Sequence, residues 1–83
     1  MNNYDLLINS KNTDPKFIDK LCNLIKSTKV KHVAFSSPDT KDNYTSITCR
    51  FTNHKDAEYI EILVLSKYHK EIEHTAIAER PGD

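Results

Sequence analysis

Apolar side chains recur along residues 15–27 at the spacing of an amphipathic helix. The stripe consists of Phe17, Ile18, Leu21, Leu24 and Ile25, three or four positions apart. Asp14 can cap the start of this helix because its carboxylate accepts from backbone donors of the first turn, and Pro15 suits the first helical position, where no donor is needed. The pattern predicts a helix from Pro15 to about Ser27.

Four other segments show the alternation that is typical of strands. They are residues 4–9, 30–36, 44–52 and 58–65. Residues 44–52 are the clearest, since Thr45, Ile47, Cys49 and Phe51 share one face and β-branched and aromatic residues are frequent. Residues 58–65 also fit a helix that starts at Ala57, but the alternation of Ile60, Ile62 and Val64 favours a strand.

A second helix is predicted over residues 67–79, where Tyr68, Ile72 and Ala76 are spaced four positions apart, and residues 79–83 are expected to form a frayed tail. With 83 residues the chain is expected to be a single domain. The element order is then β-α-β-β-β-α. We expect an α+β fold with a small, single-layer, mostly antiparallel sheet and both helices packed on one face. The first two strands would pair in parallel around a right-handed crossover.

Glycine is almost absent, because the chain contains only Gly82. Phosphate-cradling loops, dinucleotide fingerprints and the nucleophile elbow all need glycine and are therefore excluded. The turns must be built from Asn, Asp, Ser and Pro, so Asp42, Asn43 and Asn53 are the expected left-handed positions. Longer polar loops at residues 37–43 and 53–56 are expected in place of tight two-residue hairpin turns.

Charge and cysteine content limit which partners the protein is expected to bind and in which compartment it is expected to work. Twelve Lys and Arg balance twelve Asp and Glu, which argues against binding a polyanion through bulk charge. The longest apolar run is residues 62–65, far short of a membrane span, and the N-terminus lacks the features of a signal peptide, so we expect a cytoplasmic protein. Cys22 and Cys49 form no CxxC pair and are expected to be reduced thiols in or near the core.

Candidate catalytic groups are few. His69 and Glu73 would lie on one face of the second predicted helix at a spacing that can hold a metal, but an ion pair on a solvated face explains them better. Strand alternation directs Arg50 away from the thiol of Cys49, so that cation does not activate it. His32 would lie on a strand and bond a cross-strand neighbour. We expect a protein without enzymatic activity, metal or cofactor.

The sheet face opposite the helices carries the candidate binding site. It combines aromatic, aliphatic and charged side chains of the kind enriched at protein interfaces. The predicted partner-binding residues are Tyr44, Arg50, Tyr59, Glu61, Leu63 and Leu65. In the alternative interpretation, Leu63 and Leu65 are covered by the N-terminal segment or belong to a strand that is buried on both faces.

The expected order of elements resembles two RNA-associated families. The α-β-β-β-α portion is similar to the double-stranded-RNA-binding domain, and the full order is similar to small ribosome hibernation factors, which implies an RNA or ribosomal partner. The corresponding helix start, residues 66–71, has only Lys67 and Lys70, and that helix also carries Glu71, Glu73 and Glu79. The lysine-rich start by which the first family grips phosphate is therefore missing.

These observations lead to two functional hypotheses. The first is a small non-enzymatic regulator or inhibitor that binds a larger protein through its exposed sheet face, either as a monomer or as a homodimer. In size and composition it resembles the accessory inhibitors of phages and mobile elements. The second is an RNA- or ribosome-associated module that uses Lys26, Lys29, Lys31, Arg50 and the tyrosines. We favour the protein-binding regulator.

Overall fold

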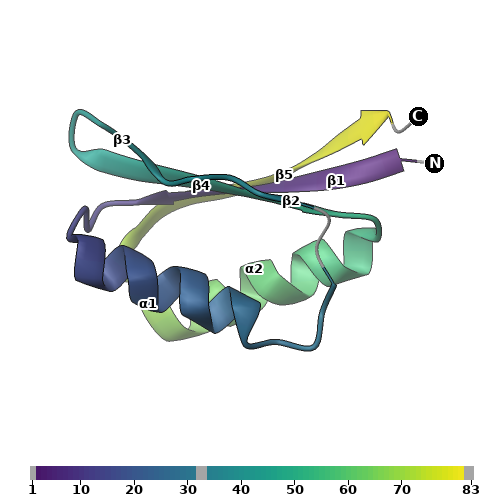
Figure 1. The fold of residues 1–83 in the computed structure, drawn as a ribbon, viewed down its shortest axis with the longest axis horizontal. Coiled ribbons are helices and arrows are strands. Elements are labelled where there is room, and N and C mark those ends of the chain that lie inside the picture. Colours follow the sequence, from purple (N-terminus) through teal and green to yellow (C-terminus); the bar gives the residue numbers. More distant parts are fainter. Residues whose placement is uncertain (1, 32–33, 82–83) are drawn as a thin grey trace.

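Five antiparallel strands form one sheet, and both helices cover the same face of it (Figure 1). The structure is a computed structural model that describes residues 2–31 and 34–81. In chain order the elements are β1 (Asn2–Ser10), α1 (Pro15–Lys26), β2 (Ala34–Phe35), β3 (Asp39–Lys41), β4 (Tyr44–Phe51), α2 (His54–Tyr68) and β5 (Ile72–Pro81). The predicted α+β class with both helices on one face is confirmed.

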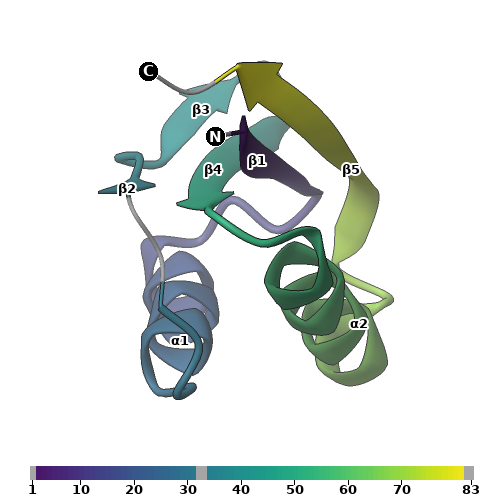
Figure 2. The ribbon, with the colours of Figure 1, turned by 90° about the vertical axis from the view of Figure 1, so that its right-hand side faces the viewer.

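The strands are ordered β2-β4-β1-β5, and β3 pairs with β4 beside β2. If β2 and β3 are counted as one interrupted strand, the order β-α-β-β-α-β is the ferredoxin-like, or split βαβ, arrangement. The expected parallel pairing of the first two strands is wrong, because β4 lies between β1 and β2 and pairs with both of them in the antiparallel sense. The two helices lie side by side beneath this sheet (Figure 2).

The helix α1 forms as its sequence predicts. The side chain of Asp14 accepts a hydrogen bond of 3.0 Å from the backbone N–H of Lys16, and Ser27 caps the other end. Ile18, Leu21 and Ile25 are buried against the sheet. One stripe of the helix therefore supplies a large share of the core, while its lysines stay in water.

The two central strands also follow their predicted alternation. Leu6 and Ile8 of β1 are fully buried, as are Ile47, Cys49 and Phe51 of β4. All five side chains face the helices and belong to a single hydrophobic cluster. Burying this much apolar area between a sheet and two helices is the main stabilising contribution available to so short a chain.

The prediction for residues 58–65 is wrong, because they lie within helix α2 rather than in a strand. Asn53 caps this helix by accepting from the backbone N–H of Lys55 at 2.8 Å. Ala57, Ile60 and Val64 are the fully buried residues, and their spacing of three and four is helical. The alternative of a helix near Ala57 is the one that the structure adopts.

The second predicted helix, residues 67–79, is also wrong, because most of that segment forms strand β5. β5 runs along β1 from Ile72 opposite Ser10 to Pro81 opposite Asn2. Residues 79–81 complete this strand instead of fraying, and residues 82–83 lie outside the described part of the chain. The resemblance to RNA-associated families depended on this helix and on the misplaced strand before it, and it no longer holds.

The turns only partly match expectation. Asp42 has a φ of 54° and is the sole described non-glycine residue with positive φ, so the predictions for Asn43 and Asn53 are wrong. Asp42 and Asn43 alone join β3 to β4, because Lys41 already pairs with Tyr44. A tight hairpin is therefore built without glycine. Of the described residues within 30–36, only Ala34 and Phe35 form a strand, and the expectation for His32 falls outside the described residues.

Candidate functional site

The face of the sheet opposite the helices carries no second layer of described secondary structure (Figure 1). Because side chains alternate along a strand, residues between the buried positions of β1 and β4 point to this open face. Cross-strand pairing aligns them in rows, of which the first joins Ala34, Arg50, Asp5 and Ala78. The next row joins Thr48, Leu7 and Ala76, and a third joins Ser46, Asn9 and His74.

Asp5 is the centre of a charged cluster on this face. Its carboxylate accepts two hydrogen bonds from the Arg50 guanidinium, from Nε at 2.7 Å and from Nη2 at 3.1 Å. Arg80 of β5 approaches the same carboxylate at 3.3 Å. Asp5 is only 8% exposed, whereas both arginines remain open to solvent. One buried carboxylate thus orients two guanidinium groups whose remaining N–H donors are available on the surface.

This geometry shifts the pKa values of both partners. The hydrogen bonds from Arg50, together with the positive charges of Arg50 and Arg80, lower the pKa of Asp5 from its ordinary value of 3.8, although burial opposes the shift. The same hydrogen bond raises the pKa of Arg50. The cluster therefore stays ionised at neutral pH, with two positive charges against one negative charge.

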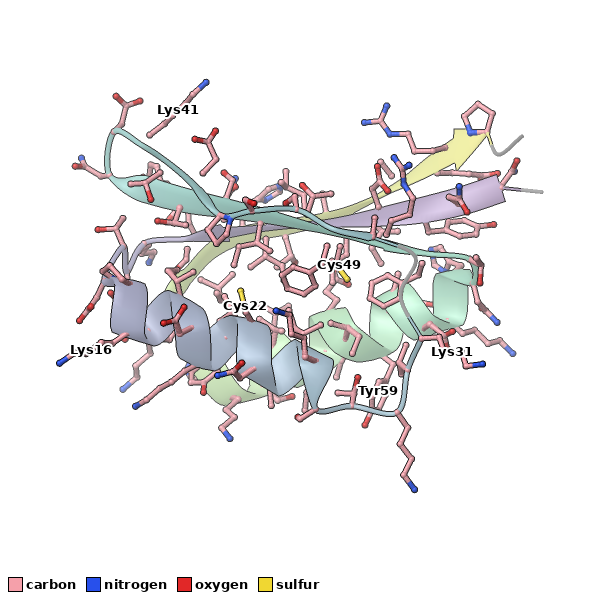
Figure 3. All side chains as sticks on the ribbon, viewed as in Figure 1. Lys16, Cys22, Lys31, Lys41, Cys49 and Tyr59 are labelled. Carbon is pink, nitrogen blue, oxygen red and sulfur yellow. The ribbon has the colours of Figure 1, made fainter. Side chains whose placement is uncertain are left out.

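Outside this charged cluster, the open face of the sheet is only partly polar. Leu7, Thr48 and Ala76 form its middle row, and each is half-buried. Toward the β3 end, Ser46 donates a hydrogen bond of 2.7 Å to Asn9. Lys41 rises from the β3–β4 hairpin on the side away from the helices (Figure 3). The face thus has a small apolar floor, with cationic groups at one end and a polar hairpin at the other.

The structure separates the six predicted binding residues into two groups. Tyr44 and Arg50 are in β4, where Tyr44 is 42% exposed next to the hairpin. The other four do not lie on the sheet at all, because they belong to α2. These residues are Tyr59, Glu61, Leu63 and Leu65. Placing them on the open face was wrong, and the reason is the helical conformation of residues 54–68.

On α2 these four residues have different environments. Tyr59 is 54% exposed and points away from the sheet (Figure 3). Glu61 is half-buried and accepts a hydrogen bond of 3.0 Å from the hydroxyl of Thr75 in β5. Leu63 and Leu65 are half-buried and pack against the core cluster, and they belong to a helix rather than to the doubly buried strand of the alternative interpretation. Ile62, which the predicted alternation grouped with Ile60 and Val64, is 61% exposed, whereas those two are fully buried.

A hollow of about 670 Å³ lies where the segment after α1 passes the start of α2. Lys29, Lys31, Asp56 and Tyr59 are among the residues that line it. Two of the lysines assigned to the RNA hypothesis are thus brought together with one tyrosine, but on the helix side of the molecule. They are separated from Arg50 and from the open face by the sheet.

The two thiols lie in the layer between the sheet and α1 (Figure 3). Neither forms a disulfide. Burial raises the pKa of the Cys49 thiol to about 12 and also raises the pKa of Cys22, which is only half-buried. Thiolate, the reactive form, is therefore scarce at both positions at neutral pH.

The described histidines do not gather into one site. His69 follows the end of α2 and Glu73 is in β5, so the predicted helical pair is wrong; Glu73 instead lies 3.6 Å from the ammonium of Lys11. Among residues 2–31 and 34–81, no three His, Cys, Asp or Glu side chains gather as metal ligands. No helix in these ranges combines the length and apolar character needed to cross a bilayer.

Sequence reasoning missed Asp5 and Arg80, the two residues that complete the cluster around Arg50. Asp5 stands between Tyr4 and Leu6 in an otherwise apolar run, and a lone carboxylate in such a strand signals a buried ion pair. No comparable signal marks Arg80, since it lies in the segment that was read as a tail.

Comparisons with known proteins support the fold only. No family model matches the chain, and no curated protein matches it either. Among solved structures the chain is similar to "De novo designed protein Foldit4", with a TM-score of 0.56 and 11% sequence identity. The similarity covers 99% of this chain and 98% of that chain. At this identity the likeness concerns the fold alone and carries no information about activity.

Proposed function

We propose that this protein is a small non-enzymatic regulator or inhibitor that binds another protein through the open face of its sheet. The observation that carries the proposal is the cluster of Arg50 and Arg80 around buried Asp5, beside an apolar floor that includes Leu7 and Ala76. Arginine is among the residues that most often anchor protein interfaces. Thr48 and Ala76 have small side chains, so the backbone or side chains of a partner can approach the sheet closely beside Leu7.

Electrostatics support a partner segment that carries carboxylates. Asp5 holds Arg50 in a bidentate arrangement before any partner arrives, so less side-chain entropy is lost on binding. The cluster keeps a net positive charge, and its outward donors suit Asp or Glu side chains. We therefore propose an acidic surface with a few apolar residues as the complement. Both thiols are free, which supports the cytoplasm as the compartment.

The RNA hypothesis is the alternative, and the open face gives it little support. Stacking platforms for RNA need aromatic side chains on the central strands of the sheet. The outward positions of β1 and β4 between the ends of the strands hold Asp5, Leu7, Asn9, Ser46 and Thr48 together with Arg50. Tyr44 lies at the extremity of β4. An origin in phages or mobile elements remains part of the proposal on size and composition alone.

The decisive experiment compares the wild type with Thr48→Glu, which places a negative charge in the middle of the open face. Thr48 is half-buried on a central strand and only its backbone is hydrogen-bonded to Ser36, so the fold should persist. Lys16→Glu serves as the control, because it makes an exposed position on α1 negative and changes the net charge by two units, against one unit for Thr48→Glu (Figure 3). Each protein is immobilised and exposed to a lysate of its native source, and retained proteins are identified by mass spectrometry.

The proposal predicts a protein that the wild type and Lys16→Glu retain and that Thr48→Glu loses, with the same order of affinities when the purified pair is measured by calorimetry. Equal retention by all three proteins contradicts the open face as the binding site. Retention of RNA that weakens steeply with salt would favour the nucleic-acid alternative. Native circular dichroism of Thr48→Glu separates lost binding from lost folding.

A further inference from the structure

Strand β5 leaves one edge of the sheet open. It pairs with β1 on one side, and no described strand lies on its other side. At the opposite edge, β4 is covered in turn by β2 and β3. β5 is ten residues long, and its middle, Thr75–Ala78, has no charged side chain. Proteins usually protect such edges with charges or bulges near the centre, because alternate N–H and C=O groups point outward and can pair with another strand.

The side chains of this strand are close to self-complementary about Ile77. Ala76 and Ala78 flank it on the open face, so the central sequence reads the same in both directions. Ile77 itself faces the helix side and is only half-buried, and no described strand lies on its outer flank. A second strand beside β5 would cover that flank and remove apolar area from water.

Geometry restricts how a second copy of β5 can pair with the first. A two-fold axis perpendicular to the sheet relates two antiparallel β5 strands and keeps the two open faces on the same side. Opposite residues must then point to the same face, so the axis lies between one residue and the same residue of the second copy. With the axis at Ala76, Glu73 of each copy lies opposite Glu79 of the other copy. Two like-charge contacts result, and these are unfavourable. An axis at Ile77 instead opposes Ala76 to Ala78, Thr75 to Glu79, and His74 to Arg80.

We infer that the protein self-associates into a symmetric dimer by antiparallel pairing of β5 with β5 of a second copy, with the two-fold axis at Ile77. The result is one continuous sheet with all four helices on the same side. The interface consists of one strand per copy, so the association is weak and depends on concentration. This inference does not depend on the proposed function, because it rests on the outward backbone groups of β5 and not on a partner bound at the cluster around Asp5.

The first test uses His74, which is exposed on the open side of β5 and lies opposite Arg80 of the second copy in this register. His74→Glu creates two ion pairs across the dimer and should tighten association about two- to tenfold, whereas His74→Arg creates two like-charge contacts and should weaken it by a similar factor. Sedimentation equilibrium measures the dissociation constant, with a monomer mass of 9.6 kDa. Lys16→Glu on α1 is the control and should leave it unchanged.

The second test does not rely on the stability of these variants. In a Cys22→Ala background, proteins carrying Ala76→Cys and Ala78→Cys are oxidised separately and as a mixture. Opposite residues of antiparallel strands are within disulfide distance, so the mixture should form a covalent heterodimer faster than either protein forms a homodimer. A wild type that stays monomeric at every concentration overturns the inference. So do equal responses to the two His74 changes, or faster crosslinking of Ala76→Cys with itself.

Discussion

Asp5 contributes both to the stability of the fold and to the candidate binding site. Its carboxylate is nearly buried, accepts two hydrogen bonds from Arg50 of β4 and forms an ion pair with Arg80 of β5. Because those bonds exist only in the folded chain, they lower the pKa of Asp5 below 3.8 there and not in the unfolded chain. The unfolded state therefore binds the proton first as the pH falls. The ionised cluster contributes its full stability above the ordinary aspartate pKa of 3.8 and loses it as the pH falls from there through the lowered pKa.

The consequence can be measured with Asp5→Asn. At neutral pH we expect the variant to be less stable than the wild type, because Arg50 and Arg80 lose a charged acceptor. The difference should shrink as the pH falls through 3.8 and below, since the wild-type carboxylate then becomes protonated too. Urea denaturation at a series of pH values, followed by circular dichroism, gives both free energies of unfolding.

Asp39→Asn provides the matched comparison, because Asp39 is exposed in β3. Its stability should follow the wild type across the same pH range. A constant difference between the wild type and Asp5→Asn down to the lowest pH would show that the ion cluster does not account for the acid sensitivity of the fold.

Helix α2 is the element that sequence patterns describe least well, and its start is the feature that decides its conformation. Asn53 has extended backbone angles and accepts from the N–H of Lys55, and Asp56 lies in the first turn, where negative charge is favourable. We expect Asn53→Ala to lower the free energy of unfolding by about 1 kcal/mol. Asn53→Asp, which keeps the acceptor, should retain most of the stability in the same chemical denaturation experiment.

If Asn53→Ala and Asn53→Asp unfold at the same denaturant concentration as the wild type, capping does not stabilise α2. The contrast with Asn23→Ala, an exposed position inside α1, controls for the general effect of replacing asparagine by alanine in this protein. That change should be neutral or slightly stabilising, because alanine has the higher helix propensity.

The elements that could be predicted from sequence are those with one clear period. The stripe of α1 and the alternation of β1 and β4 each have their buried apolar residues on a single face, and all three elements were predicted correctly. In α2, apolar residues extend to the exposed surface, as with Tyr59 and Ile62, so alternation and helical spacing fit equally well. The polar cap Asn53 and the first-turn Asp56 were the signals that could have decided between them.

Strand β5 could not be predicted because its sequence favours the wrong element. It contains Ala76, Ala78 and two glutamates, all better suited to a helix, and only its pairing along β1 makes it a strand. The candidate site was affected in the same way. Arg50 was found from the alternation of β4, but its neighbours Asp5 and Arg80 depend on which strands lie side by side, which local patterns do not contain.

At the scale of the whole molecule, Cys49 is a probe of how cooperatively the core opens. Its thiol is fully buried between the sheet and the helices, and its pKa is about 12. An alkylating reagent can therefore modify it only after unfolding. In native buffer we expect mass spectrometry to show slow modification of Cys22 alone, and modification of both thiols in denaturant. The Cys49 rate should rise in parallel with global unfolding as urea is added.

Rapid native modification of Cys49 that is insensitive to urea would instead mean that the sheet and α1 separate locally. Cys22→Ala removes the competing site, and its Cys49 modification rate should equal that of the wild type. Because Cys22 packs at the edge of the core and not at its centre, this change should leave the fold intact.

The first and last strands of the chain are neighbours, with Asn2 opposite Pro81 and both ends of the ribbon on the same side of the molecule (Figure 1). β1 is a central strand, yet β5, one of its two partners, is synthesised after all the other described elements. Such pairing between distant parts of the sequence slows folding, because a long loop must close before the contact is gained. On the ribosome, the sheet therefore remains incomplete until β5 has left the exit tunnel, and until then β1 presents an unpaired edge that a chaperone can bind.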